Sequence, residues 1–294
     1  MSSPADSMGR HLYWSSILAA GAFVCLLVYP QLRSLTLSTD PAPAAARGFA
    51  AAQPKNPVTY GDLLSAAQAR LATLPAGMLD RTDLTSGLGQ KGPKGWGLLE
   101  SPELKSAAEL QARNMMVERF RSGVDNNGMG PGDRVAMLDR SGLYDGLDEQ
   151  FAEVVGAANS SSGFAEMAKL FDQTSEADRA KTAAFNRFGM GCVQSRSDII
   201  CVRTLGKLSG HLAVPLPIAR HRSDALDLQP KLDEAGISAA GWVLRDSLGS
   251  VLSSGQSFSR VQMPTNYRGP VRVGIATTGN HQIDELDGPA FAAQ

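Results

Sequence analysis

The segment GCVQSRSDIIC, Gly191 to Cys201, holds two of the three cysteines in this 294-residue chain. It predicts two short strands, residues 189–194 and 199–205, joined by a turn near Arg196 and Ser197. Mirror symmetry about that turn places Cys192 opposite Cys201. Directly opposed residues of an antiparallel pair lie close enough for a disulfide, so we expect that bond. Two reduced cysteines buried in a core strand are the alternative.

A disulfide requires an oxidising compartment, and the N-terminal sequence indicates a route to one. Leu12 to Tyr29, LYWSSILAAGAFVCLLVY, carries no charge over 18 residues, which is near the lower limit for a membrane-spanning helix. The stretch is long for a signal core, and no small-residue cleavage site follows directly. We therefore expect a single-pass anchor in the bacterial cytoplasmic (inner) membrane. The N-terminus would lie inside and the bulk of the chain in the periplasm; a cleaved signal peptide is the alternative.

Small residues within this stretch predict how the anchor packs. Such residues permit close helix approach in lipid, so we expect one face to contact another membrane protein. That face contains Ala19, Ala20, Gly21, Phe23 and Leu27. Residues 34–58 follow as a linker that is rich in Pro and Ala and has too few large apolar residues to bury a core.

The rest of the chain has the composition of a globular protein. Its net charge of −1 gives no indication of a nucleic-acid partner. A helix is expected over residues 60–74, and a second one begins at Ser101, a good N-cap that precedes Pro102. Arg113 is expected on the solvent face of the second helix. From residue 207 onward, short apolar runs separated by turns predict a small antiparallel β domain that ends in an irregular tail over 277–294.

Three stretches in order resemble the CAP superfamily of cysteine-rich secretory, pathogenesis-related and bacterial SCP-like proteins. They are LLESPELKSAAELQARNMM from Leu98, PGDRVAMLDRSGLYDGLDEQFAEVV from Pro131, and TSEADRAKTAAFNRFGMGCV from Thr174. The resemblance covers residues 59–206. It implies an α+β fold, a three-layer α-β-α sandwich, preceded here by one transmembrane helix and followed by the small β domain.

The family cleft carries two His and two Glu that can bind a divalent metal, and this chain departs from that pattern. One glutamate is retained as Glu153. The first His position falls near Asn126 or Asn127, and the second falls on or beside Asp178. The other glutamate falls near Thr174, with Glu176 close by. No histidine occurs between His11 and His211. The resemblance therefore implies a cleft remnant with no metal, no cofactor and no catalytic residue, and Glu153 is expected to cap or ion-pair within the fold.

Two functions follow as hypotheses. The first is a non-enzymatic interaction or scaffold protein, an accessory subunit of a larger membrane protein complex such as a respiratory or photosynthetic assembly. Leu12 to Tyr29 would also contact membrane lipid. The second is a module that binds a small apolar ligand or lipid between Phe151, Phe164 and Phe171. A cell-envelope hydrolase that uses Glu153 is a weaker alternative.

Overall fold

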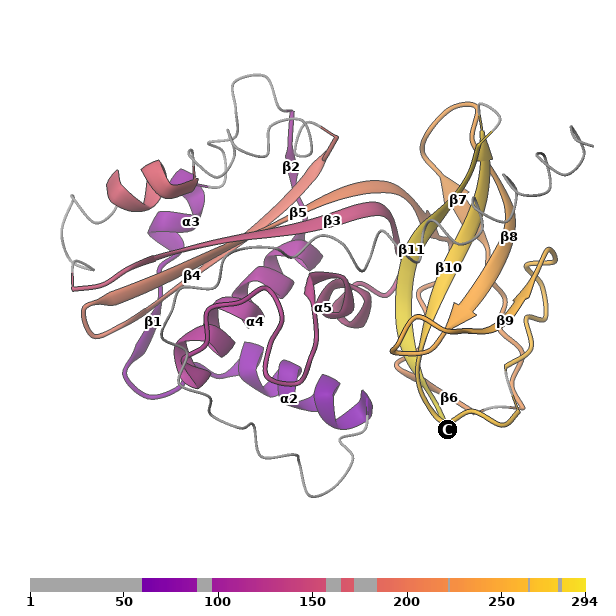
Figure 1. Cartoon of the computed structure of the whole chain (residues 1–294), viewed down its shortest axis with the longest axis horizontal. Coiled ribbons are helices and arrows are strands. Elements are labelled where there is room, and N and C mark those ends of the chain that lie inside the picture. The colour runs from indigo at the N-terminus through magenta and orange to yellow at the C-terminus, as the bar shows by residue number, and fades with distance from the viewer. Residues whose placement is uncertain are drawn as a thin grey trace, which may run out of the picture. The chain divides into compact units, whose positions relative to one another are not determined.

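The computed structural model describes residues 60–88, 97–156, 165–171, 184–221, 223–263, 265–279 and 282–294, and the structure below is that of these residues. Four named helices occur in the first part: α2 (Tyr60–Ala72), α3 (Thr82–Leu88), α4 (Pro102–Glu118) and α5 (Pro131–Leu138). Residues 165–171 add a short helical segment. Most strands come later in the chain (Figure 1).

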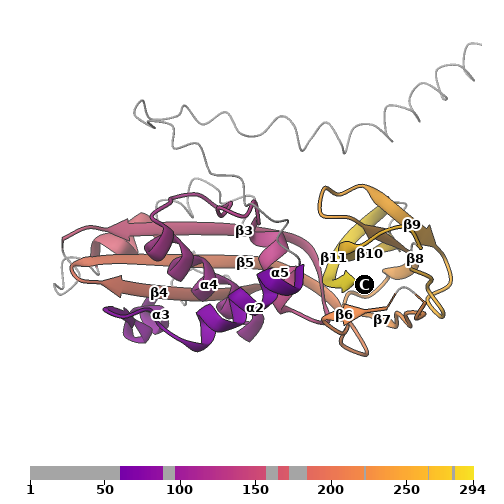
Figure 2. The same ribbon diagram turned by 90° about the horizontal axis from the view of Figure 1, so that it is seen from below.

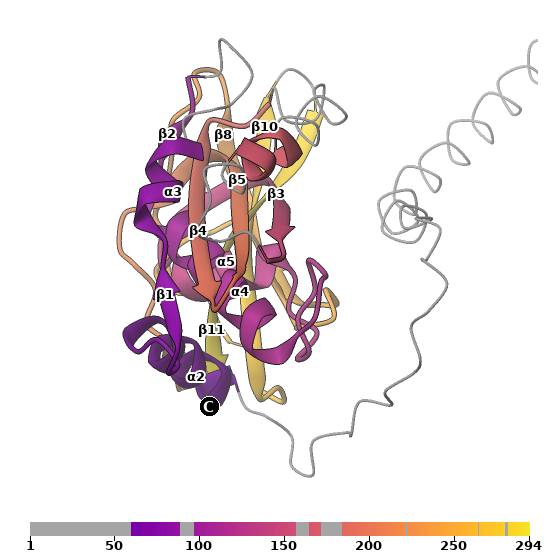
Figure 3. The same cartoon turned by 90° about the vertical axis from the view of Figure 1, so that its left-hand side faces the viewer.

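One sheet of eleven strands connects the described residues. Its main path is β1-β4-β5-β3-β11-β10-β8-β9, and three short strands attach beside it. Neighbours pair antiparallel along this path. The strands are β1 (Met78–Asp80), β2 (Leu99–Glu100), β3 (Gly142–Val154), β4 (Arg187–Ser195), β5 (Asp198–Leu212), β6 (Ala219–Arg220), β7 (Pro230–Leu232), β8 (Ser238–Arg245), β9 (Val251–Gly255), β10 (Gly269–Gly279) and β11 (Gln282–Ala293). Figure 3 shows β4, β5 and β3 side by side.

Helix α4 packs closely against β4 because two glycines leave room for it. A Cβ atom on Gly191 would lie 2.5 Å from the backbone of Glu109, and one on Gly189 would overlap the backbone of Leu104 and Lys105. The alanine-rich face of α4 completes this contact. Ala108, Ala112 and Met115 pack with Val193, Ile200 and Val202 of the sheet. Figure 2 shows α4 lying across the β4 and β5 strands.

The expected start of α4 is confirmed, and one of its expected exposed positions is wrong. The Ser101 hydroxyl accepts a hydrogen bond from the Leu104 N–H at 3.2 Å, and Pro102 occupies the first turn. Arg113, expected in solvent, is buried. Its guanidinium donates to the carbonyls of Arg70 and Leu71 at the end of α2 and to Asp80 of β1. A long cation there satisfies helix-terminal carbonyls that would otherwise lack partners.

The C-terminal strands have their own apolar core. Val271, Val273 and Ile275 of β10 pack with Trp242 and Leu244 of β8, and with Phe291 of β11. The irregular tail expected over 277–294 is therefore wrong, because β11 occupies most of it. This strand lies between β3 and β10 in the sheet, and its Phe291 is fully buried.

The expected fold class, a three-layer α-β-α sandwich followed by a small antiparallel β domain, is also wrong. Strand β5 has 15 residues and β3 has 13, so both extend beyond the part covered by α4. Tyr144 of β3 then pairs with Asp287 of β11. The strands before and after residue 206 thus belong to one large antiparallel sheet, and helices cover only part of it.

The structure also corrects the expected localisation as a single-pass inner-membrane protein. Across the described parts of residues 60–294, no helix is sufficiently long and apolar to cross a bilayer. The longest of these helices, α4, has 17 residues and contains five charged side chains. Leu12 to Tyr29, with the packing residues Ala19, Ala20, Gly21, Phe23 and Leu27, lies outside the described residues.

Candidate functional site

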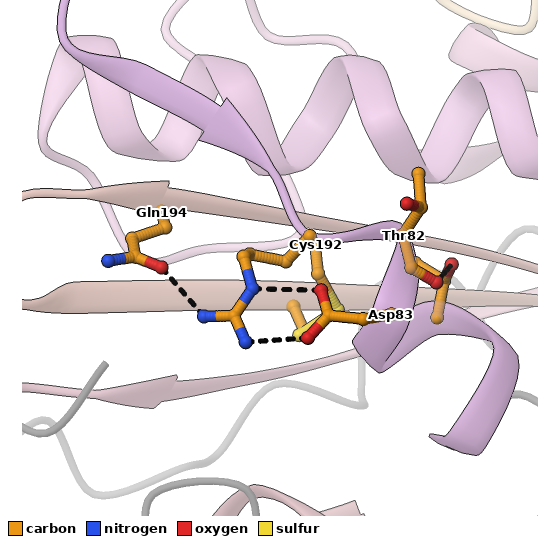
Figure 4. The surroundings of a disulfide bond; sticks show 7 residues. Thr82, Asp83, Cys192 and Gln194 are labelled. Atoms are coloured by element: carbon orange, nitrogen blue, oxygen red, sulfur yellow. Dashed lines mark hydrogen bonds and ion pairs between the residues drawn. A yellow bond between two sulfur atoms is a disulfide. The ribbon is translucent and has the colours of Figure 1, made fainter. Parts of the chain in front are cut away.

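The strand pair that contains the two cysteines forms as expected, and the disulfide is confirmed. Cys192 of β4 is the direct partner of Cys201 of β5, their Cα atoms are 4.1 Å apart, and the two sulfurs are bonded. Both cysteines are buried in a cluster with Leu84 of α3 and Phe171. Figure 4 shows Cys192 beside Thr82 and Asp83. The bond therefore crosslinks β4 and β5 on the face opposite α4.

The residues next to the disulfide hold α3 against β4. The Arg81 N–H donates to the Cys192 carbonyl at 3.0 Å. The Arg81 guanidinium donates to both carboxylate oxygens of Asp83, at 2.8 and 2.7 Å, and to the Gln194 side chain at 2.7 Å (Figure 4). These contacts fix the start of α3 to the crosslinked strand pair, which is a structural role.

Two of the four predicted cleft residues, Glu153 and Asn127, lie in the described structure, and each has a partner of its own. Glu153 on β3 pairs with Arg121, whose Nε donates to Glu153 Oε2 at 2.7 Å. This ion pair joins β3 to the segment after α4. Asn127 lies in a loop, where its N–H donates to Asp125 Oδ1 at 2.8 Å. Glu176 and Asp178 lie outside the described residues.

The phenylalanines of the expected apolar pocket do not share one wall. Phe171 packs with Ala152 on the disulfide face of the sheet. Phe151 is the neighbour of Ala152 on β3, so its side chain points to the other face, where it is partly exposed. Phe164 lies outside the described residues.

A cleft of about 510 Å³ is the main candidate site, and we name it the α5–β10 cleft. It lies among the start of α2, the loop before α5, the turn between β8 and β9, and strands β10 and β11. Its volume falls within the range of ligand pockets. The lining residues are Tyr60, Leu63, Asn127, Gly128, Met129, Asp133, Arg245, Asp246, Ser247, Leu248, Gly249, Pro270, Arg272, Asp287 and Ala290.

Paired charges form one wall of the α5–β10 cleft. Arg272 of β10 donates to Asp133 of α5, and its Nη1 lies 3.8 Å from Asp287 Oδ1 on β11. Arg245 donates to both carboxylate oxygens of Glu285, at 2.8 and 2.6 Å. The first pair joins α5 to β10, so it ties the helical side of the cleft to the strand side.

The turn between β8 and β9 forms the rim of the cleft. Asp246 Oδ1 accepts the N–H groups of Leu248 and Ser250, at 2.9 and 2.8 Å. Gly249 supplies the left-handed backbone that this turn needs, with φ of +82°. The side chain of Leu248 is thereby held in solvent at 89% exposure, and Val251, which begins β9, is 55% exposed. Of these two apolar side chains, Leu248 lines the cleft.

A buried ion pair supports the cleft loop, which we define as residues 122–129. Arg134 of α5 is fully buried, and its Nη2 donates to both carboxylate oxygens of Glu149 at 2.8 Å each. The same guanidinium donates to the carbonyls of Gly123 and Met129, at 2.9 and 2.7 Å. Asp125 Oδ1 accepts the N–H of Met129 at 3.0 Å. One arginine therefore holds both ends of the loop that carries Asn127 and Met129 to the cleft.

This ion pair predicts a pH-dependent stability. Burial raises the pKa of Glu149 from 4.5 to about 7, against the opposing effect of Arg134. The folded chain thus holds this proton more tightly than the unfolded chain. Between these two pKa values the free energy of unfolding falls as the pH rises, by about 3 kcal/mol at most. Denaturant unfolding of the wild type and of Glu149→Gln over that range checks this, because the variant cannot titrate there.

The matched control is Glu153→Gln, which removes a carboxylate from an ion pair that is not fully buried. Its stability difference from the wild type should change much less over the same range. Parallel curves of unfolding free energy against pH for the wild type and Glu149→Gln would contradict the expectation.

Only one part of the α5–β10 cleft, the turn between β8 and β9, could have been predicted from the sequence. Asp133 and Arg272 are 139 positions apart, and no spacing rule brings them together. The turn could have been found, because Asp246 and Gly249 occupy the favoured first and fourth positions of a β-turn. Within the described ranges, no group of three or more His, Cys, Asp or Glu residues is arranged to hold a metal ion.

Comparisons with known proteins add little to this geometry. No family model matches the chain, and no curated protein matches it significantly. The CAP resemblance thus stays a prediction. Among solved structures, an outer surface protein from Borrelia burgdorferi is similar over 50% of this chain and 91% of that chain, with 15% identity and a TM-score of 0.31. No argument rests on a similarity of this size.

Proposed function

We propose that this chain is a non-enzymatic interaction protein, an accessory subunit that binds a partner protein at the α5–β10 cleft. The observation that carries the proposal is the rim of the cleft. Two hydrogen bonds to Asp246 and the left-handed conformation of Gly249 fix the turn between β8 and β9. The turn holds Leu248 in solvent beside a cleft of about 510 Å³. An apolar side chain that is already held in place costs little conformational entropy when a partner covers it.

The roles of the charged groups around the cleft support a binding function over a catalytic one. Arg272 holds Asp133, Arg245 holds Glu285, and Arg134 holds Glu149. Each of these contacts joins two elements of the fold. A binding surface requires this kind of rigid support, because a partner then meets a preformed shape. A membrane protein complex as the partner stays a prediction, as does the apolar-ligand alternative.

Site-specific photo-crosslinking tests the proposal. The full chain is expressed in its own organism with a benzophenone amino acid in place of Leu248, and the crosslinked products are identified by mass spectrometry. The control places the same group at Leu79 of β1, which is 61% exposed and does not line the cleft. We expect one partner protein to be crosslinked from position 248 and not from position 79.

A crosslinker at Ser247, which also lines the cleft, should capture the same partner. Adding the Leu248→Ser substitution should abolish that crosslink. The proposal is wrong if positions 248 and 79 give the same products, or if gentle purification yields only a monomer and position 248 crosslinks nothing.

A further inference from the structure

The α5–β10 cleft has more negative than positive groups in its wall. Three aspartates line it, Asp133, Asp246 and Asp287, against the two arginines Arg245 and Arg272. The charge of Arg245 is already balanced by its ion pair with Glu285. The remaining arginine, Arg272, therefore faces more than one carboxylate. A cleft with surplus carboxylates attracts a cationic group.

Asp287 is the carboxylate with the weakest partner in this wall. Arg272 donates a direct hydrogen bond to Asp133, whereas its distance to Asp287 is 3.8 Å, beyond hydrogen-bond length. The Asp287 side chain is 52% exposed. An incoming cation can thus reach its oxygens without breaking the contact between Arg272 and Asp133, which fixes α5 to β10.

Apolar groups line the same cleft as Asp287. Leu63 and Met129 lie on the helical side of the cleft, while Pro270 and Leu248 lie on the strand side. A cation that fits a cleft with apolar walls and a carboxylate has a long apolar stem and a charged end. Lysine and arginine side chains have this build, since their methylene groups pack on apolar surface while the charge reaches a polar partner.

We propose that the α5–β10 cleft binds a lysine or arginine side chain of the partner protein, with the charge at Asp287 and an apolar neighbour of that residue against Leu248. This inference rests on the proposed function and adds the chemistry of the partner. A free amine confined to the cleft would leave Leu248 in water. A polypeptide that places a basic residue beside a large apolar one covers both features together.

A short peptide of defined sequence tests this inference. The probe is acetyl-Ala-Leu-Lys-Leu-Ala-amide, titrated calorimetrically into the full chain at low and high salt. Its matched analogues replace Lys with norleucine, which keeps the stem and removes the charge, or with Glu. We expect the Lys peptide to bind about tenfold more tightly than the norleucine peptide at low salt, with the difference reduced at high salt. The Glu peptide should not bind.

Two substitutions locate the effect. Asp287→Asn should lower the affinity for the Lys peptide about tenfold and leave the affinity for the norleucine peptide unchanged. Leu248→Ser should weaken both peptides. Asp227→Asn is the matched control, because Asp227 is an exposed aspartate that does not line the cleft, and it should change neither affinity.

The inference is overturned if the Lys peptide does not bind, if the three peptides bind equally, or if Asp287→Asn has the same effect as Asp227→Asn. Competition by n-butylammonium at the concentration of the peptide would also overturn it, since a free amine would then suffice. If a partner is crosslinked from position 248 while peptide binding is insensitive to charge, only this inference fails and the proposed function stands.

Discussion

Gly191→Ala is expected to lower the free energy of unfolding by about 3 kcal/mol. The added methyl group would lie 2.5 Å from the backbone of Glu109. Backbone atoms of a helix cannot move aside individually, so α4 as a whole must shift away from β4. That shift loosens the contacts of Ala108 and Ala112 with Val193 and Ile200. Denaturant unfolding followed by circular dichroism measures the loss.

Gly146→Ala is the matched control for this substitution. Gly146 also lies in a strand, β3, and the nearest atom to its added methyl group would be 3.8 Å away, at the Phe185 ring. This variant should change stability by less than about 1 kcal/mol. Equal losses for the two variants would show that the close approach of α4 to β4 is not what makes glycine necessary at position 191.

Arg134→Met is expected to cost about 3–5 kcal/mol at pH 8, because it leaves the Glu149 carboxylate buried without its cation. It also removes the donors to the carbonyls of Gly123 and Met129. At pH 5, below its pKa of about 7, Glu149 is already protonated in the wild type, so the first part of this cost should be smaller there. Thermal and denaturant unfolding at the two pH values measure the difference.

The double variant Arg134→Met, Glu149→Leu separates the two contributions. With both charges removed, the cost of a buried unpaired charge is gone, and the remaining loss should come from the cleft loop alone and be independent of pH. If the single variant is equally unstable at pH 5 and pH 8, the unpaired carboxylate is not the cause.

Local sequence patterns predicted the elements whose evidence lies within a few residues. The turn near Arg196 set the register of Cys192 and Cys201, and Ser101 followed by Pro102 set the start of α4. Patterns failed where distant segments decide the outcome. The burial of Arg113 depends on the end of α2, some 42 residues earlier. The placement of β11 depends on β3, from which it is separated by more than a hundred residues.

The expected sandwich was wrong for the same reason. The resemblance to the CAP superfamily covers residues 59–206, and the continuation of the sheet from β3 into β11 leaves no local signal in that part of the sequence. Residues 277–294 looked irregular because Asp284, Glu285 and Asp287 interrupt the apolar positions. In the sheet these three acids are exposed while Leu286 and Phe291 are buried. Asp284 and Glu285 are consecutive and both exposed, and residues 288–293 are all buried, so β11 lacks the simple alternation that would have predicted a strand.

The place of β11 in the sheet has a consequence for synthesis of the chain. The strands β3, β4 and β5 and the helix α4 are complete once residue 212 has left the ribosome. Strand β11 then has to enter beside β3, which was made more than a hundred residues earlier. Until it does, Asp133 has no Arg272 and the α5–β10 cleft is incomplete. The proposed binding site therefore needs strands that are made last, whereas the segments that form its helical side are made early.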